Sequence, residues 1–336
     1  MISLLTIMTL KFKFNKIIPM KGHVFFPTEI IFAVTDRCNL HCAHCFVQKG
    51  NHNLDAEKAK QFLASCKNTP IDMVGFSGGE PFLNLDFITE TVKCAVSQDM
   101  MFDRIITNGV WWQNQKDLEE KLTRLYDAGY DGKIGLSWDS FHGQPQEKIL
   151  AFIKTVYKIW NQSDILDIQS VISENCENNI EDLENFDFLA EALSCSEEPN
   201  LNKKTGRGTI ILENESIYLT IHRETQSFNS EDNRPWKSRR WFKDDFCEGP
   251  GQILYVHPNG KIAPCCGFSN ENEALILGTL DDSYQKIMQS AGQNEMIRIC
   301  YEEGLSKQIK KFKRQVPGKT EDICAFCDFV CKNRNI

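Results

Sequence analysis

Short apolar runs alternate with longer amphipathic stretches along residues 28–172 of this 336-residue chain. The apolar runs have the length of buried strands, and the stretches between them repeat apolar residues at helical spacing. Strands and helices in this order predict a parallel sheet with helices packed outside it. The expected strands are Glu29–Val34, Asp72–Phe76, Asp103–Thr107, Lys133–Trp138 and Leu166–Ile172, and the expected helices are Asp55–Cys66, Leu85–Ser97, Gln115–Tyr130 and Gln146–Trp160.

The alternation becomes less regular after residue 172. Residues 173–198 are acidic and contain no lysine or arginine, and Phe186–Leu193 within them is expected to pack as a helix with a solvated face. Residues 199–208 are typical of a loop. Thr209–Leu212 and Tyr218–His222 are again strand-like, and we expect them to close or extend the sheet.

Three cysteines follow the first expected strand, in the run Cys38-Asn39-Leu40-His41-Cys42-Ala43-His44-Cys45. A zinc site normally uses four ligands in paired spacings, which this loop lacks. Closely spaced thiolates are the usual ligands of iron–sulfur clusters. Three thiolates can hold three irons of a four-iron cluster and leave the fourth iron open, which favours catalysis.

A second motif, Ser77-Gly78-Gly79-Glu80-Pro81, follows the second expected strand. In this order, the cysteine triplet and the Gly-Gly-Glu-Pro element resemble the signature of the radical S-adenosylmethionine enzymes. The resemblance implies an α/β fold, a partial (β/α)6 TIM-like barrel with a small C-terminal iron–sulfur domain. Chemistry in such barrels occurs at the carboxyl ends of the strands, and both motifs directly follow a strand.

The same resemblance implies the cofactors and the residues that contact them. A [4Fe–4S] cluster on Cys38, Cys42 and Cys45 would bind S-adenosylmethionine, whose reductive cleavage releases a 5′-deoxyadenosyl radical. The expected cofactor-binding residues are Gly78, Gly79 and Glu80 at the amino group, His44 beside the adenine with Phe46 packed nearby, and Asn108, Ser137 and Asp139 towards the ribose and carboxylate. The alternative for Asn108, Ser137 and Asp139 is a helix-capping or turn role.

A second group of cysteines lies near the C-terminus. Pro258-Asn259-Gly260-Lys261 predicts a hairpin turn that would bring Cys247 and Cys265 side by side. With Cys324, Cys327 and Cys331, this group resembles the SPASM or Twitch auxiliary-cluster domain of the same enzymes. The simplest assignment is one auxiliary [4Fe–4S] cluster on Cys247, Cys265, Cys324 and Cys327, with Cys331 either replacing a ligand or belonging to a second site. A structural zinc on the same cysteines is the alternative.

Cys266 is adjacent to an expected ligand and admits two interpretations. It can be an inert thiol of the hairpin. It can also donate a hydrogen atom to a substrate radical, as a lone cysteine does in some peptide epimerases of this family. Core or surface thiols are the expectation for the remaining cysteines, Cys66, Cys94, Cys176, Cys195 and Cys300.

We expect an N-terminal extension at residues 1–24, the barrel at 25–235 and the auxiliary domain at 236–336. The net charge of −8 disfavours nucleic acid as the substrate, and no apolar run is long enough to span a membrane. Grouped cysteines suit metal ligation in a reducing cytoplasm better than disulfides.

The resemblance implies an enzyme that modifies a ribosomally made peptide or a protein residue by epimerisation, crosslinking or oxidation. A reducing donor of the flavodoxin or ferredoxin type would supply its electrons. The alternatives are a radical dehydrogenase of a small molecule such as an amino sugar, and a non-catalytic iron–sulfur or zinc-binding protein.

Overall fold

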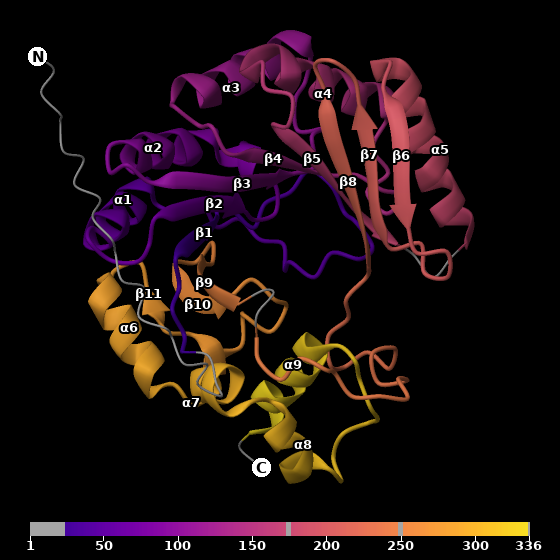
Figure 1. Cartoon of the computed structure of the whole chain (residues 1–336). Coiled ribbons are helices and arrows are strands. Elements are labelled where there is room, and N and C mark those ends of the chain that lie inside the picture. The colour runs from indigo at the N-terminus through magenta and orange to yellow at the C-terminus, as the bar shows by residue number, and fades with distance from the viewer. Residues whose placement is uncertain (1–23, 173–175, 248–250, 335–336) are drawn as a thin grey trace, which may run out of the picture.

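The computed structural model describes residues 24–172, 176–247 and 251–334. Within these residues one continuous sheet has the strand order β11-β10-β9-β1-β2-β3-β4-β5-β8-β7-β6 (Figure 1). The strands are β1 (Glu29–Ala33), β2 (Met73–Ser77), β3 (Met101–Thr107), β4 (Lys133–Ser137), β5 (Leu166–Ile172), β6 (Ser196–Leu201), β7 (Gly208–Glu213), β8 (Tyr218–Thr225), β9 (Gly251–Val256), β10 (Lys261–Cys265) and β11 (Gly278–Thr279).

The helices lie outside this sheet and below it. They are α1 (Ala56–Ser65), α2 (Leu85–Val96), α3 (Gln115–Asp127), α4 (Gln146–Trp160), α5 (Cys176–Leu193), α6 (Tyr284–Gln293), α7 (Glu295–Ile297), α8 (Ser306–Phe312) and α9 (Ile323–Asn333). None of the described helices combines the length and the apolar composition that crossing a bilayer requires.

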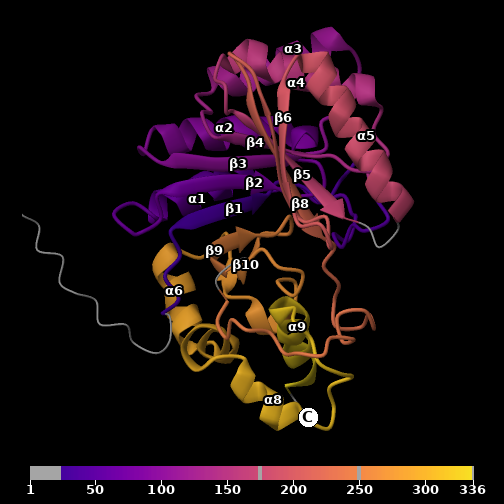
Figure 2. The same ribbon diagram turned by 45° about the vertical axis from the view of Figure 1, so that its right-hand side comes forward.

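The predicted partial barrel is confirmed. Strands β1 to β5 pair in parallel in chain order, and β8 adds to β5 as a sixth parallel strand. Helices α1 to α4 cover the convex face, as in other α/β barrels (Figures 1 and 2). Strands β7 and β6 continue the sheet beyond β8 in antiparallel pairing, so the barrel stays open on that side.

Local sequence explains where the barrel helices begin and how they pack. The Asp55 side chain accepts a hydrogen bond from the Lys58 amide (3.0 Å) and caps α1, and Asn114 caps α3 in the same way at Asp117 (3.1 Å). Ile30 and Phe32 of β1 are fully buried against the helices, while Glu29 and Ile31 point to the barrel interior.

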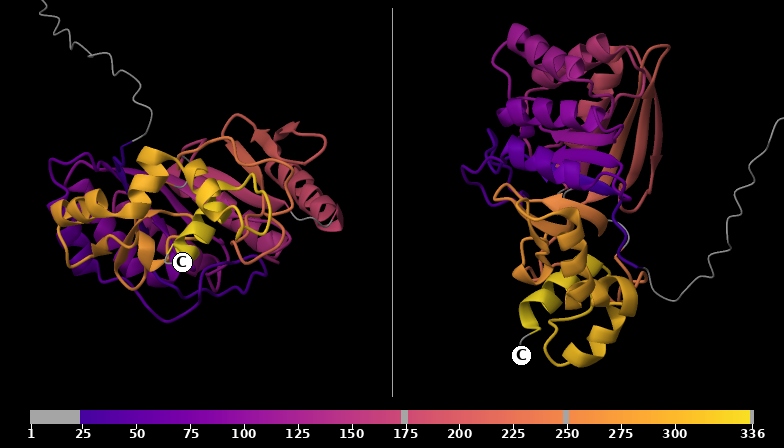
Figure 3. Two further views of the ribbon diagram at one scale, coloured as in Figure 1. Left: turned by 90° about the horizontal axis from the view of Figure 1, so that it is seen from below. Right: turned by 90° about the vertical axis from the view of Figure 1, so that its left-hand side faces the viewer.

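The C-terminal part of the chain joins the barrel through the sheet. Strand β9 pairs in parallel with β1, and the predicted hairpin forms between β9 and β10, with the His257 amide donating to the Lys261 carbonyl (2.8 Å). Helices α7 to α9 pack below this hairpin (Figure 3), whereas α6 lies beside barrel helix α1, with the Tyr284 amide donating to the Ser65 hydroxyl (3.0 Å). The connector 226–247 packs on α9, with Trp236 against Phe329 and Trp241 against Phe326.

Candidate functional site

The three cysteines of the first motif lie in the loop that follows β1. Cys38 and Cys42 are half-buried, and Cys45 is exposed. The start of this loop is bonded to the Gly-Gly-Glu-Pro element after β2, since the Gly79 amide donates to the Thr35 carbonyl (2.7 Å) and the Glu80 amide to the Arg37 carbonyl (2.8 Å). The two sequence motifs are therefore adjacent in space.

The glycines of this element are required by the cysteine loop itself. Gly78 has a φ of 139°, and a Cβ added there would lie 2.6 Å from the Thr35 carbonyl oxygen. A Cβ on Gly79 would overlap the Arg37 carbonyl oxygen. The sequence predicted that these glycines line the cofactor, and the structure adds a second reason for their presence.

Glu80 is fully buried and receives three hydrogen bonds from the protein. Its carboxylate accepts from the Phe82 amide (3.1 Å), the Thr107 hydroxyl (2.9 Å) and the Asn108 amide (2.8 Å). Burial raises the pKa of Glu80 to about 7, although these bonds oppose the shift. Glu80 thus ties the Gly-Gly-Glu-Pro element to the end of β3, and its contact with the cofactor's amino group stays a prediction.

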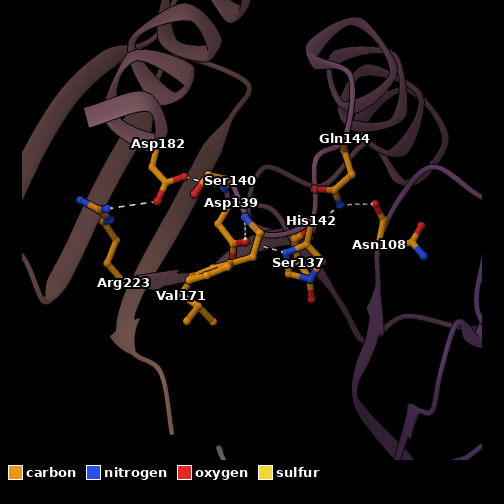
Figure 4. A network of polar contacts seen from close by, with 10 residues as sticks. Asn108, Ser137, Asp139, Ser140, His142, Gln144, Val171, Asp182 and Arg223 are labelled. Atoms are coloured by element: carbon orange, nitrogen blue, oxygen red, sulfur yellow. Dashed lines mark hydrogen bonds and ion pairs between the residues drawn. The ribbon is translucent and has the colours of Figure 1, made fainter. Parts of the chain in front are cut away.

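Asn108, at the end of β3, contacts the cysteine loop directly. Its side-chain amide donates to the Asn39 side chain (2.9 Å) and lies 3.8 Å from the Cys38 sulfur. Gln144, which the sequence did not single out, donates to the carbonyls of both Asn108 and Ser137 (2.7 Å each) (Figure 4). It links the ends of β3 and β4, where the sequence predicted cofactor contacts.

Asp139, just beyond β4, is buried and fully engaged. It accepts from the Phe141 amide (3.0 Å), the His142 ring (2.7 Å) and the Val171 amide (2.9 Å) (Figure 4). These bonds fix the turn that carries Phe141 and His142, whose rings pack on His44 with centroids 5.0 Å and 4.8 Å away. In this structure Asp139 has the turn role that the sequence left open as the alternative.

Next to this turn, a buried ion pair joins two further elements. The Ser140 amide donates to Asp182 of α5 (2.7 Å), and Asp182 pairs with Arg223 of β8 at 3.5 Å (Figure 4). Both charged side chains are almost completely buried, so each depends on the other for compensation. The pair holds β8 and α5 against the end of β4.

Several buried polar atoms in this region have no partner within the protein. They are His44 Nδ1, Ser140 Oγ, Gln144 Oε1, Ser170 Oγ and Arg223 Nε. Buried polar atoms are normally satisfied, so these atoms are available to a polar ligand at this end of the barrel. S-adenosylmethionine, with its amino, carboxylate and hydroxyl groups, fits this requirement.

The thiols of the first loop fit a four-iron cluster. Each thiolate of a four-iron cluster binds a different iron, so its ligands surround the cluster without converging on one point. The donor set of the first loop, three thiols and no carboxylate, is the set that such clusters use.

The second cysteine group is brought together in the auxiliary part. A small cavity is lined by Cys247, Cys265, Cys324 and Cys327, the four residues expected to hold an auxiliary cluster. Burial, together with the neighbouring Cys327, raises the pKa of Cys247 to about 12. Metal binding would replace these protons, because thiols ligate as thiolates.

Two more thiols flank Cys327. The Cys300 sulfur lies 3.7 Å from the Cys327 sulfur, and Cys331 adjoins Cys327 from the next turn of α9. The sequence suggested Cys331 as a ligand but expected Cys300 to be only a core or surface thiol. Cys300 has no nearby cysteine in sequence, and it reaches the site because the Cys247 amide bonds to its carbonyl (3.0 Å).

Cys266 differs from its neighbour Cys265. Cys265 is buried and lines the cysteine cavity, whereas Cys266 is exposed and does not line it. Adjacent residues at a strand end point to opposite faces, which explains the difference. Cys266 is therefore a free thiol beside the auxiliary site.

An open cleft of about 580 Å³ separates the cysteine loop from the auxiliary part. Its walls are Ala43–Phe46, the connector residues 226–234, the loop 268–272, and Asp328 and Lys332 of α9. Phe46 is exposed and faces Phe268 across the cleft, with ring centroids 6.4 Å apart. The cleft has the size of a small-molecule or extended-peptide site.

Two family models match this chain. The model of the radical SAM superfamily matches residues 32–167, and the model of an iron–sulfur cluster-binding domain, SPASM, matches residues 247–328. The first range contains the cysteine triplet and the ends of β2 to β4. The second contains Cys247, Cys265, Cys324 and Cys327.

Known proteins resemble this chain in sequence or in fold. The putative peptide biosynthesis protein YydG of Bacillus subtilis (strain 168) is 22% identical over 308 residues, which is 87% of this chain and 88% of YydG. An S-adenosylmethionine-dependent nucleotide dehydratase of Selenomonas ruminantium is 32% identical, over only 32% of this chain and 38% of that protein. Native anSMEcpe with bound AdoMet has the same fold, with a TM-score of 0.52 at 14% identity over 90% of this chain and 96% of that one.

Proposed function

Because this chain belongs to the radical SAM superfamily and carries an iron–sulfur SPASM domain, we propose that it modifies a residue of a ribosomally made peptide. The chain is a radical SAM enzyme. Its cofactors are a [4Fe–4S] cluster and S-adenosylmethionine in the barrel, and iron–sulfur binding in the SPASM domain. Membership of this superfamily argues against the non-catalytic alternative.

The observation that carries the proposal is the cleft beside Cys45. It is bordered by both the cysteine loop and the auxiliary part, and its volume of about 580 Å³ can hold a segment of extended peptide. The similarity to YydG, a putative peptide biosynthesis protein, spans both parts of this chain and supports a peptide over a small molecule.

When bound at Cys38, Cys42 and Cys45, the cluster and S-adenosylmethionine supply a 5′-deoxyadenosyl radical that takes a hydrogen atom from the substrate. The residues of this chain bind and orient the reactants. His44 packs against Phe141 and His142, and burial lowers the pKa of His44, so it offers a neutral ring. Gln144 and Asn108 fix the ends of β3 and β4 that face the cofactor.

Within this proposal, Cys266 is the hydrogen-atom donor of an epimerase. Once the α-hydrogen of one residue has been removed, the Cys266 S–H bond, which is weaker than most C–H bonds, would return a hydrogen atom from the other face. One electron from the external donor and one solvent proton then restore the thiol. Cys266 is exposed and precedes by two residues Phe268, which lines the cleft, and both facts support this role.

The test is a reaction in D2O with the reconstituted enzyme, S-adenosylmethionine, a reductant and a short peptide encoded beside its gene. An epimerase should introduce a single solvent deuterium at one residue, which becomes a D-amino acid detectable by chiral amino-acid analysis. Cys266→Ala should still form 5′-deoxyadenosine but should give no D-residue.

Cys94→Ala is the matched control, because Cys94 is a partly buried thiol on α2, far from both cysteine groups. A peptide that loses two hydrogens without gaining deuterium would replace epimerisation by crosslinking or oxidation. An enzyme that cleaves S-adenosylmethionine but leaves every such peptide unchanged would contradict the peptide proposal.

A further inference from the structure

One segment of the auxiliary part is strongly basic although the protein is acidic overall. Residues 304–320 contain six cations and no carboxylate, against a net charge of −8 for the whole chain. The cations are Lys307, Lys310, Lys311, Lys313, Arg314 and Lys319, and all six are exposed. The segment forms α8 and the loop that leads to α9.

The connector adds four more exposed cations to the same surface. The Ser238 amide donates to the Lys319 carbonyl (3.1 Å), and the Leu305 amide donates to the Asp245 carbonyl (3.0 Å), so residues 238–245 are joined to both ends of the basic segment. We call the combined surface the basic face. It consists of Lys237, Arg239, Arg240, Lys243, Lys307, Lys310, Lys311, Lys313, Arg314 and Lys319.

The basic face is not neutralised by its surroundings. Ion pairs engage many other described lysines and arginines, but none involves a member of the basic face. Two nearby carboxylates accept hydrogen bonds from serines, Asp245 from the Ser306 amide (2.6 Å) and Glu321 from the Ser238 hydroxyl (2.6 Å), and keep their charge. Asp244 and Glu302 are exposed near the edge, and these four carboxylates together are too few to cancel ten cations. Unpaired like charges on one surface repel one another, and a partner of opposite charge would relieve that repulsion.

The position of the basic face separates it from the cleft. None of its residues lines the cleft beside Cys45. The segment instead begins and ends at the auxiliary cysteine cavity, because Leu305 just before α8 and Ile323 and Cys324 just after the loop line that cavity. Helix α8 lies at the end of the molecule remote from barrel helices α3 and α4 (Figures 1 and 2).

We propose that the basic face is the docking site of an acidic, flavodoxin-type electron donor. The inference rests on the proposed function only in requiring that a protein reduces the clusters. An acidic donor would be repelled by the molecule as a whole, so a local cationic surface is needed to attract and orient it. In the productive complex, a flavin hydroquinone loses one electron, and the cluster nearest the basic face, in the auxiliary site, gains it.

This location favours an electron donor over the peptide as the occupant. A peptide bound on the basic face would place its reacting residue away from Cys45, whereas a donor bound there lies next to a cysteine-lined site through which electrons can reach the barrel. Electron-transfer complexes are small and transient, and a patch of exposed charges suits such an encounter.

The test uses Lys310→Glu/Lys313→Glu in the reconstituted full-length enzyme. The probe is a bacterial flavodoxin of strongly negative net charge, reduced to the hydroquinone, and its oxidation by the enzyme is followed by stopped-flow absorbance without peptide. The second-order rate should fall about tenfold at low ionic strength. The difference should vanish near 1 M salt, where the Debye length is about 3 Å.

Two further variants make the result specific. Lys203→Glu/Lys204→Glu carries the same charge change in the exposed loop between β6 and β7 and should leave the rate almost unchanged. Arg239→Glu/Arg240→Glu alters the basic face outside α8 and should slow the reaction as the first variant does. Iron content and the electron paramagnetic resonance signals after dithionite reduction should match wild type in all three.

An unchanged flavodoxin rate in both basic-face variants would overturn the proposal, and so would equal slowing by the control. Since the assay contains no peptide, it can succeed even when the proposed peptide modification fails, so the two proposals are tested separately.

Discussion

At the scale of single residues, Glu29 carries a carboxylate that the barrel interior does not compensate. Its Oε1 is buried without a hydrogen-bond partner. Arg104, the nearest cation, is paired instead with Asp103 (3.3 Å) and Asp167 (3.2 Å). Burial, and then repulsion by Asp103, raise the pKa of Glu29 to about 7, and Arg104 opposes the shift only in part.

Replacing this carboxylate should therefore stabilise the enzyme at alkaline pH. Between the unfolded pKa of about 4.3 and the folded value of about 7, native Glu29 binds a proton that the unfolded chain lacks. Wild-type stability falls as the pH rises through this window. Glu29→Gln should remove that loss and raise the free energy of unfolding at about pH 8 by roughly 1–2 kcal/mol, allowing for partial exposure.

The measurement is anaerobic urea unfolding at several pH values. Glu198→Gln serves as the control, since Glu198 is exposed on the edge strand β6. If the pH dependence of Glu29→Gln matched that of wild type, Glu29 would be ionised throughout and the interior would compensate its charge.

Residue spacing predicted some of the site and could not predict the rest. Cys38, Cys42 and Cys45 lie in one loop, so their spacing alone indicates a cluster. Cys300 and Gln144 carry no such signal, because each reaches the site through contacts with distant residues, Cys327 and Asn108. Asp139 accepts hydrogen bonds from Phe141, His142 and Val171, which no sequence pattern announces, and its contact with the cofactor stays a prediction.

At the scale of elements, the contact between the cysteine loop and the Gly-Gly-Glu-Pro element determines whether the first cluster can be held. Gly79→Ala should push the Arg37 carbonyl away and misplace Cys38, since the added Cβ would overlap that oxygen. We expect the variant to lose at least half of the iron of the first cluster while the auxiliary iron stays. Iron analysis and electron paramagnetic resonance after anaerobic reconstitution measure both.

Gly292→Ala in α6 is the matched control. A Cβ there meets nothing within 4 Å, and alanine favours a helix. Equal iron in Gly79→Ala and wild type would mean that the loop adapts to the added methyl group and that the glycine serves the cofactor alone.

The burial pattern of the strands and helices explains why most of them could be predicted from the sequence. Strands β1 to β5 and helices α1 to α4 each bury one apolar face. Their hydrophobic periodicity therefore predicts them, with ends correct to within a few residues. Strand β6 was predicted as a loop or acidic stretch. Its sequence Ser-Glu-Glu-Pro-Asn-Leu is exposed almost throughout, and only backbone pairing with β7 makes it a strand.

At the scale of the whole molecule, the barrel and the auxiliary part share one sheet. Strand β9 pairs with β1 from Glu29 to Phe32, and Phe25, just before β1, packs on Tyr301 of the auxiliary part. The boundary near residue 235 that we propose therefore separates two chemical sites but crosses a continuous hydrogen-bonded layer.

A chain that ends at residue 235 should consequently fail to behave as a separate domain. Without β9, the backbone groups along the outer edge of β1 lose their partners, and unpaired edges of this kind associate with other chains. We expect soluble aggregates by size-exclusion chromatography. Full-length Cys265→Ser/Cys327→Ser, which disrupts the auxiliary ligands but keeps β9, is the control and should remain folded. A monomeric truncated barrel that still assembles the cluster on Cys38, Cys42 and Cys45 would instead show that β1 tolerates an open edge and that the auxiliary part is dispensable for folding.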